Sequence, residues 1–158
     1  MRHKLFDKVV KTIFLVVSLG YVGISSADDA GATMDPNGTI ASFTGFALVT
    51  CTSSGSVPTD YLEASIRDDS PPQDGLLVNL QIIHVGNGFN RAISTTDPVS
   101  GDGEFSPVVK LHGGNGTYLL LVNKTDAGAR KFVVSYHCQS ADTPPIHTDT
   151  AIGVYQFE

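Results

Sequence analysis

The sequence has no tryptophan, only two cysteines, and ten Lys and Arg against sixteen Asp and Glu. The shortage of basic residues gives a formal net charge of −6, which disfavours binding to nucleic acid or to anionic lipid. The absence of tryptophan disfavours a cleft that binds sugars by aromatic stacking. No segment carries an apolar repeat of 3.6 residues over more than two turns, which argues against helices.

The motifs of several common enzyme classes are also missing. There is no G-x-S-x-G sequence, and no Lys-Ser/Thr pair follows the glycines of residues 113–116, so nucleophile-elbow and phosphate-loop enzymes are not indicated. The histidines lie in separate segments without metal-ligand spacing: His84, His112, His137 and His147. We therefore expect a protein that is not an enzyme. Two alternatives stay open: a small hydrolase that uses carboxylates, and a carrier of a transition metal on the scattered histidines.

Residues 1–27 have the pattern of a secretory signal peptide. A basic head precedes an apolar run of about ten residues, 13–22, and the small residues Ser25 and Ala27 come just before Asp28. The alternative is an N-terminal membrane anchor, for which the run is short because spanning takes about 20 residues. We expect export to the periplasm or secretion, with no stable membrane insertion after cleavage.

The remaining chain has the length of one domain. We expect residues 28–38, which are small and polar, to form a flexible leader, and residues 39–158 to form a single folded domain. This part keeps six Lys and Arg against fifteen Asp and Glu, so its net charge is −9. Such a charge suits solubility outside the cytoplasm or the binding of cations.

Cys51 and Cys138 both lie in the predicted mature chain. In an exported protein, an even pair of cysteines indicates a disulfide. Each cysteine ends an alternating segment and shares parity with that segment's apolar residues, which indicates that both point inward. We predict a disulfide that ties the first long strand to the strand ending at Cys138.

Short alternating or apolar segments, punctuated by Gly, Pro and Asp, predict an all-β fold. The expected strands lie within residues 39–52, 61–67, 76–85, 91–96, 105–111, 118–122, 131–138 and 146–157. Within the first of these, Phe43 and Phe46 differ in parity, and a bulge near Gly45 would turn both inward. Pro107 places its segment at a sheet edge. We expect one antiparallel β-sandwich, jelly-roll or immunoglobulin-like, of seven to eight strands; a small barrel is the alternative.

The clearest structural signal is the stretch 116–138. An apolar run from Tyr118 to Val122 is followed by turn residues, in which Gly128 is free to take a positive φ, and then by an alternating segment that ends at Cys138. We predict that the two segments form a β-hairpin.

Acidic residues gather in two Gly- and Pro-rich loops. The candidate ligands are Asp68, Asp69, Asp97, Asp102 and Glu104. Carboxylates together with carbonyl oxygens are what calcium prefers, although the EF-hand spacing is missing. Calcium is thus the one cofactor that the sequence suggests, and the competing interpretation is that these are solvated turn residues.

The closing half of the chain, from GGNGTYLLLVNK to RKFVVSYHC, resembles the end of bacterial pre-peptidase C-terminal modules and, more loosely, CUB-type sandwiches. The resemblance covers about a third of the chain, and it implies a secreted, non-catalytic β-sandwich. Some modules of this kind bind calcium or carbohydrate. We therefore expect an exported, non-catalytic binding or interaction module with a protein or carbohydrate partner and no nucleic-acid partner.

Overall fold

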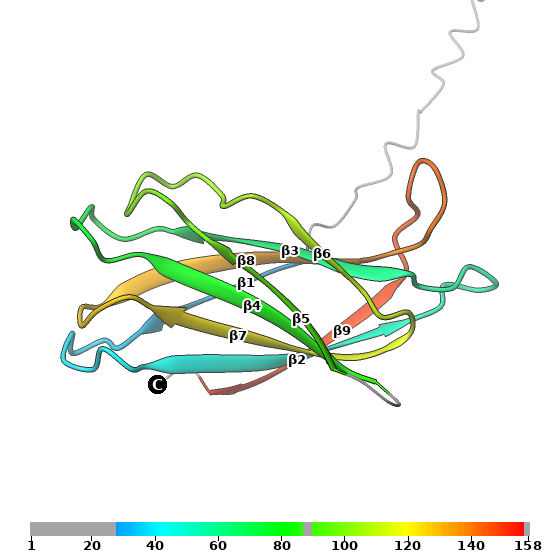
Figure 1. Cartoon of the computed structure of the whole chain (residues 1–158), viewed down its shortest axis with the longest axis horizontal. Helices are drawn as coiled ribbons and strands as arrows, with labels where there is room; N and C mark the ends of the chain where they lie inside the picture. The colour runs from blue at the N-terminus through cyan, green and yellow to red at the C-terminus, as the bar shows by residue number, and fades with distance from the viewer. Residues whose placement is uncertain (1–27, 87–89, 157–158) are drawn as a thin grey trace, which may run out of the picture.

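The computed structural model describes residues 28–86 and 90–156, so the predicted signal peptide lies outside the described residues. Two antiparallel sheets pack face to face (Figure 1). The four-stranded sheet has the order β1 (Asp28–Met34), β8 (Arg130–Gln139), β3 (Tyr61–Asp68), β6 (Val109–His112). The five-stranded sheet has the order β5 (Asn90–Thr96), β4 (Val78–Val85), β7 (Gly116–Lys124), β2 (Thr44–Thr52), β9 (Asp149–Gln156).

The predicted all-β antiparallel sandwich is confirmed, with nine strands in the described ranges rather than seven or eight. No helix in these ranges is long and apolar enough to cross a membrane. The segment with Pro107 leads into β6, a four-residue strand at the edge of its sheet, as the proline predicted.

The additional strand is β1, and it corrects the prediction of a flexible leader at residues 28–38. β1 pairs antiparallel with β8, and Ala30 and Ala32 pack against the core while Met34 is fully buried. Alanine and glycine carry little strand propensity, so this segment gave no strand signal. Pairing with a strand that is already in place supplies the backbone hydrogen bonds that the side chains do not predict.

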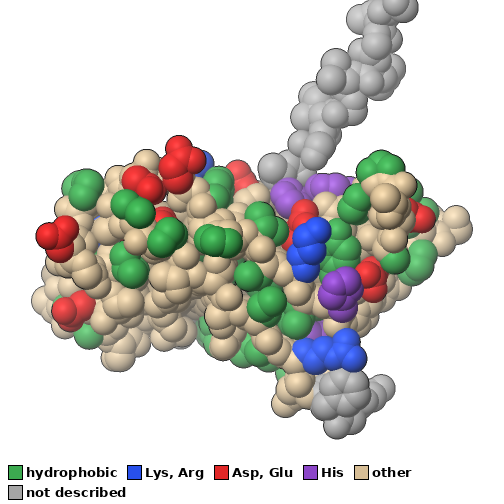
Figure 2. Space-filling view, turned by 45° about the horizontal axis from the view of Figure 1, so that its top comes forward, with side chains coloured by type: hydrophobic (Ala, Val, Ile, Leu, Met, Phe, Trp, Pro, Cys, Tyr) green, Lys and Arg blue, Asp and Glu red, His purple; other side chains and the backbone are tan. Residues whose placement is uncertain are grey.

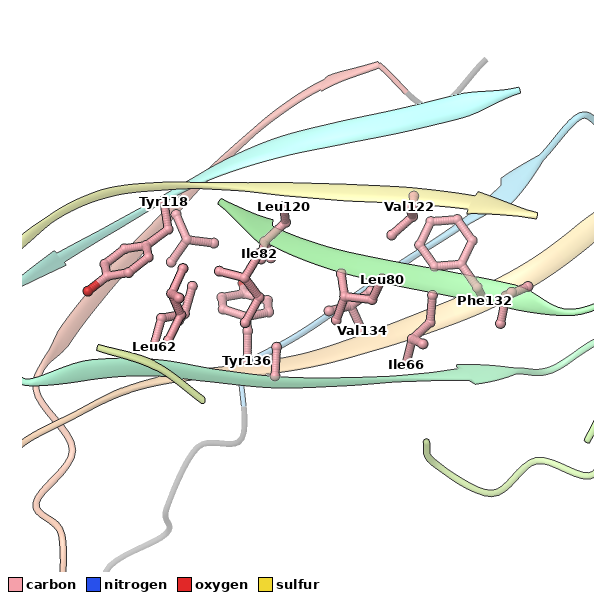
Figure 3. Packing of buried hydrophobic residues seen from close by; sticks show 14 of the residues in the cluster. Leu62, Ile66, Leu80, Ile82, Tyr118, Leu120, Val122, Phe132, Val134 and Tyr136 are labelled. Carbon is pink, nitrogen blue, oxygen red and sulfur yellow. The ribbon is translucent and has the colours of Figure 1, made fainter. Parts of the chain in front are cut away.

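The core lies between the sheets and is built from the inward residues of each alternating strand (Figure 3). In β8 the predicted inward set of Phe132, Val134, Tyr136 and Cys138 is buried. In the segment that ends as β4, the predicted set of Leu76, Val78, Leu80 and Ile82 is likewise buried. Parity along each strand therefore gave the correct inward face.

The predicted hairpin between β7 and β8 is wrong. β7 pairs with β2 and β4, whereas β8 pairs with β1 and β3, so residues 125–129 carry the chain from one sheet to the other. Gly128 has φ 141° in this connection, as expected, and a side chain there would collide with Leu76. Alternation shows which face of a strand is inward, but not which strand lies beside it.

Phe46 is the second correction. Phe43 is buried, but Phe46 is only half-buried on the outer face of the five-stranded sheet, where its ring stacks on Tyr155 with centroids 5.7 Å apart. The irregularity falls between Phe46 and Ala47, and only in the pairing with β9. The pairing with β7 runs without a shift, so Phe46 keeps the outward parity of its position.

The predicted disulfide is confirmed. Cys51 of β2 and Cys138 of β8 are bonded across the core, with their Cα atoms 5.6 Å apart and both side chains fully buried. The bond joins the two sheets at the end of the sandwich opposite residues 125–129.

We expect Cys51→Ala and Cys138→Ala to lower the free energy of unfolding by similar amounts, at most about 4 to 5 kcal/mol from the chain-entropy estimate for so long a loop. The double substitution should add little to either, because one bond is lost in all three variants. Urea unfolding followed by circular dichroism measures this. A double variant that loses nearly twice as much as each single variant would contradict the prediction.

Candidate functional site

The two acidic loops predicted from the sequence lie together at the end of the sandwich that holds residues 125–129, which we call the arch end (Figure 1). Asp68 and Asp97 are both fully buried there. A carboxylate oxygen of Asp97 accepts the backbone N–H of Asp68 at 2.7 Å, and its other oxygen accepts the N–H of Val99 at 3.2 Å. The two aspartates thus connect β3 to the loop that follows β5.

The position that a cation would take beside Asp68 is occupied by the guanidinium of Arg130. Arg130 Nη1 lies 3.1 Å from Asp68 Oδ2 and also donates to the carbonyl of Pro71 and the hydroxyl of Ser100, while Nη2 donates to Gln73. Arg130 is the first residue of β8 and is 3% exposed. Its charge balances Asp68 and its hydrogen bonds hold both loops.

The other predicted calcium ligands point elsewhere. Asp69 forms a surface ion pair with Arg67 at 2.9 Å. Asp102 and Glu104 are exposed, and Asp102 accepts the backbone N–H of Glu104 within a turn. Asp102 also lines an open cleft of about 390 Å³ between the loops. In the described part of the chain, no three His, Cys, Asp or Glu side chains are grouped so that they could hold a metal ion.

In the described structure, the predicted acidic residues and the histidines do not converge in one pocket. Burial raises the pKa of Asp97, and the two N–H groups that its carboxylate accepts oppose this shift. His112 pairs with Tyr61 at the start of β3, whereas Asp68 ends that strand. Tyr61 and Asp68 are seven residue steps apart, about 23 Å at the usual rise per residue. The acidic loops and the histidines therefore occupy opposite ends.

A second buried ion pair at the arch end was not predicted. Lys124, the last residue of β7, points into the core, and its Nζ lies 2.9 Å from Asp35 Oδ2. The ammonium also donates to the carbonyls of Ile40 and Asp126. Burial alone would raise the pKa of Asp35, but the Lys124 ammonium and three backbone N–H groups outweigh it, so the pKa is held far below its ordinary value.

The histidines gather toward the opposite end of the molecule, beside Lys and Arg side chains (Figure 2). His112 Nδ1 lies 2.9 Å from Asp60 Oδ2. The ring of His84 lies against the ring of Tyr118 at this end of the sandwich. On the outer face of the four-stranded sheet, the rings of His137 and His147 lie 4.7 Å apart. This face also carries ion pairs, such as that between Lys110 and Glu63 at 3.3 Å.

The outer face of the five-stranded sheet is chemically different. It carries a stripe of large apolar side chains that are only half-buried and that lie opposite one another across the strands: Phe46, Leu48, Ile83, Leu119 and Leu121. Among the strand residues that the structure describes, the pairing places one charged side chain on this face, that of Asp149 at the start of β9. We call this surface the neutral face.

Uncharged polar side chains border the stripe and are held by hydrogen bonds to each other. Asn79 donates to Asn123 at 2.8 Å and accepts from Thr96 at 2.7 Å. Gln81 donates to Ser94 at 3.1 Å in the next row. These amides and hydroxyls are therefore already ordered before any ligand arrives, which lowers the entropy lost on binding.

An open hollow of about 520 Å³ lies where the neutral face meets the loops at the histidine-bearing end. Apolar and polar groups line it together: Leu48, Ile83, His84, Val85, Gly86, Asn115, Gly116, Thr117 and Leu119. Gly116 has φ 147°, and a side chain there would press against the ring of His84. This backbone conformation and the nearby ring both favour glycine at the position.

Comparison of this chain with protein-family models, with curated proteins and with solved structures found no match. The chemistry of the surfaces described above is therefore the basis on which a function is proposed.

We expect Arg130→Met to lower the free energy of unfolding by about 3 to 5 kcal/mol, because it leaves the Asp68 carboxylate buried without its partner. The matched control is Lys131→Met, which removes a neighbouring but exposed charge and should change stability by less than about 0.5 kcal/mol. Equilibrium unfolding in urea measures both. Equal effects in the two variants would show that the buried pair is not the stabilising element.

Burial and the neighbouring His147 lower the pKa of His137, against the opposing charges of Glu63, Asp28 and Asp29. The unfolded chain therefore binds more protons than the native state just below the ordinary value of 6.5, and stability should fall as the pH falls through it. We expect a lower melting temperature at about pH 5.5 than at about pH 7.5, and a smaller difference in His137→Gln. An unchanged difference in that variant would contradict this assignment.

Proposed function

We propose that this protein is an exported, non-catalytic interaction module that binds a protein partner through the neutral face. The observation that carries the proposal is the distribution of charge over the two sheets. The outer face of the four-stranded sheet carries ion pairs, whereas the neutral face combines a half-buried apolar stripe with ordered amides and hydroxyls.

The composition of the neutral face is that of a protein interface. The centre of such interfaces is depleted in charged residues and enriched in apolar and aromatic ones, and the rim is polar. Here Leu48, Leu119 and Leu121 lie at the centre, and the stacked pair of Phe46 and Tyr155 lies toward the edge strand. Docking on this surface buries apolar area without stripping water from carboxylates, which would be costly.

Export is supported by the disulfide, because a bonded pair of cysteines is compatible with an oxidising compartment outside the cytoplasm. A periplasmic or secreted location, reached through the predicted signal peptide, is part of the proposal. A non-catalytic role agrees with the resemblance of the closing half to pre-peptidase C-terminal modules, which itself remains a prediction. The buried acids of the loops support it as well, since Asp35 and Asp68 are engaged in structural ion pairs.

The test is site-specific photo-crosslinking in cells of the native host. A benzophenone-bearing residue is placed at Leu48 or at Leu119 on the neutral face, and at Val133 on the outer face of the four-stranded sheet as the matched control. All three native side chains are half-buried in strands, so the substitutions disturb similar environments. We expect a discrete protein adduct from Leu48 and Leu119 and none from Val133.

Adducts from Val133 alone, or from all three positions equally, would overturn the assignment of the neutral face. Adducts whose added mass is removed by glycosidases would identify carbohydrate instead of protein as the partner. Far-ultraviolet circular dichroism of each variant verifies that the sandwich is intact before the adducts are compared.

A further inference from the structure

β9 is an edge strand whose second edge is open in the described structure. It pairs with β2 from Asp149 to Gln156, and the order of the five-stranded sheet ends with it. A strand in this position presents unpaired backbone N–H and C=O groups, which are a template for pairing with another chain.

β9 lacks most of the features that protect the edge strands β5 and β6. β6 is only four residues long and follows Pro107, and β5 carries Arg91, whose side chain donates to the carbonyl of His112. β9 is eight residues long and contains no proline, lysine or arginine. Short length, proline, charged side chains and bulges are the usual devices that block strand addition. β9 is neither short nor interrupted by proline, and its one charge, Asp149, and its irregularity beside Tyr155 lie toward its two ends, so residues 150–154 are left competent to pair.

The side chains of β9 are also unusually exposed for their type. Ile152 is 37% exposed, Val154 53% and Tyr155 63%. Ile152 and Val154 lie on the core side of the sheet, opposite Val49 and Ala47, and the core is incompletely covered there. An additional strand beside β9 would bury these groups, and the area removed from water would stabilise the contact.

We propose that the added strand is β9 of a second copy, so that the protein forms a homodimer with twofold symmetry in which the two five-stranded sheets become continuous. A twofold axis normal to the sheet makes the two strands antiparallel and keeps the same faces together. Opposite residues must then have the same parity, and an axis at Gly153 satisfies this. It places Ile152 opposite Val154 on the core side, and Ala151 opposite Tyr155 on the outer side.

This register is self-complementary. Two apolar residues meet on the core side, a small residue faces a large ring on the outer side, and glycines meet at the axis, where crowding would be greatest. The single charged residue of β9, Asp149, lies four positions from the axis. The two copies of Asp149 are therefore separated by about 26 Å, well beyond the screening length of about 8 Å at physiological salt.

Charge also selects this edge for contact between two copies of an acidic chain. The net charge of −6 makes the copies repel each other unless they meet through a surface with little charge. The edge of β9 is continuous with the neutral face, and edge-to-edge pairing leaves that face open. The dimer is thus independent of the proposed partner site and would present two copies of it on one side.

Sedimentation velocity of the purified full chain between about 1 and 200 µM tests the dimer, because this range brackets the affinity expected of a modest interface. The variant is Val154→Lys, which places an ammonium group opposite Ile152 of the second copy. The matched control is Ala92→Lys, at an exposed position on β5, the opposite edge of the same sheet. We expect a dimer for the native chain and for Ala92→Lys, and a dissociation constant raised at least about tenfold in Val154→Lys.

Amide hydrogen exchange provides a second measurement that does not depend on a substitution. Amides in residues 149–156 should exchange more slowly as the concentration rises, and amides of β5 should not change. A native chain that is monomeric over the whole range, or a Val154→Lys variant that dimerises as tightly as Ala92→Lys, would overturn the proposal. A monomer that still gives adducts at Leu48 would refute the dimer and leave the proposed function standing.

Discussion

The sandwich depends on two buried cations, Lys124 and Arg130, which stand at either end of the connection from β7 to β8. A cation removed from water needs hydrogen-bond acceptors, and both of these take acceptors from loops that come from other parts of the chain. Lys124 binds the segment after β1 through an ion pair with Asp35 and a hydrogen bond to the carbonyl of Ile40. Arg130 holds the loops after β3 and β5 through hydrogen bonds to Asp68 and Ser100. The charge of one short connection therefore organises a whole end of the molecule.

The connection between β7 and β8 joins the interior strands of both sheets, so its few residues affect how the two sheets are held together. β7 lies at the centre of the five-stranded sheet and β8 is an interior strand of the other, so residues 125–129 join the interiors of both layers. At the opposite end, the bond between Cys51 and Cys138 joins the same two layers covalently. The sheets are thus fixed to one another at both ends, by ion pairs at one and by the disulfide at the other. The outer faces of the two sheets take no part in these connections.

The sequence predicted the strands β2 to β9, most of their inward residues and the disulfide, because these follow from local alternation and from the count of cysteines. It did not predict the pairing of β7, since alternation carries no information about a strand's neighbour. β1 was missed because Ala30, Ala32 and glycine give no apolar pattern. Lys124 was taken for a turn residue, because a buried lysine looks like any other lysine until its partner Asp35, far away in the chain, is placed beside it.

The same limitation hid the neutral face. Counted along the chain, the charges make the whole protein look acidic. Only the pairing of five strands shows that, among the described strand residues, Asp149 is the one charged residue on this surface. Phe46 illustrates the consequence: a bulge that turned it inward would be the expected solution for a large aromatic ring, yet the sheet keeps it outside against Tyr155. Holding such rings and leucines at a half-exposed surface forgoes burial that the core could have used. Part of the apolar area of these side chains stays in water, and docking of the proposed partner would remove it from water.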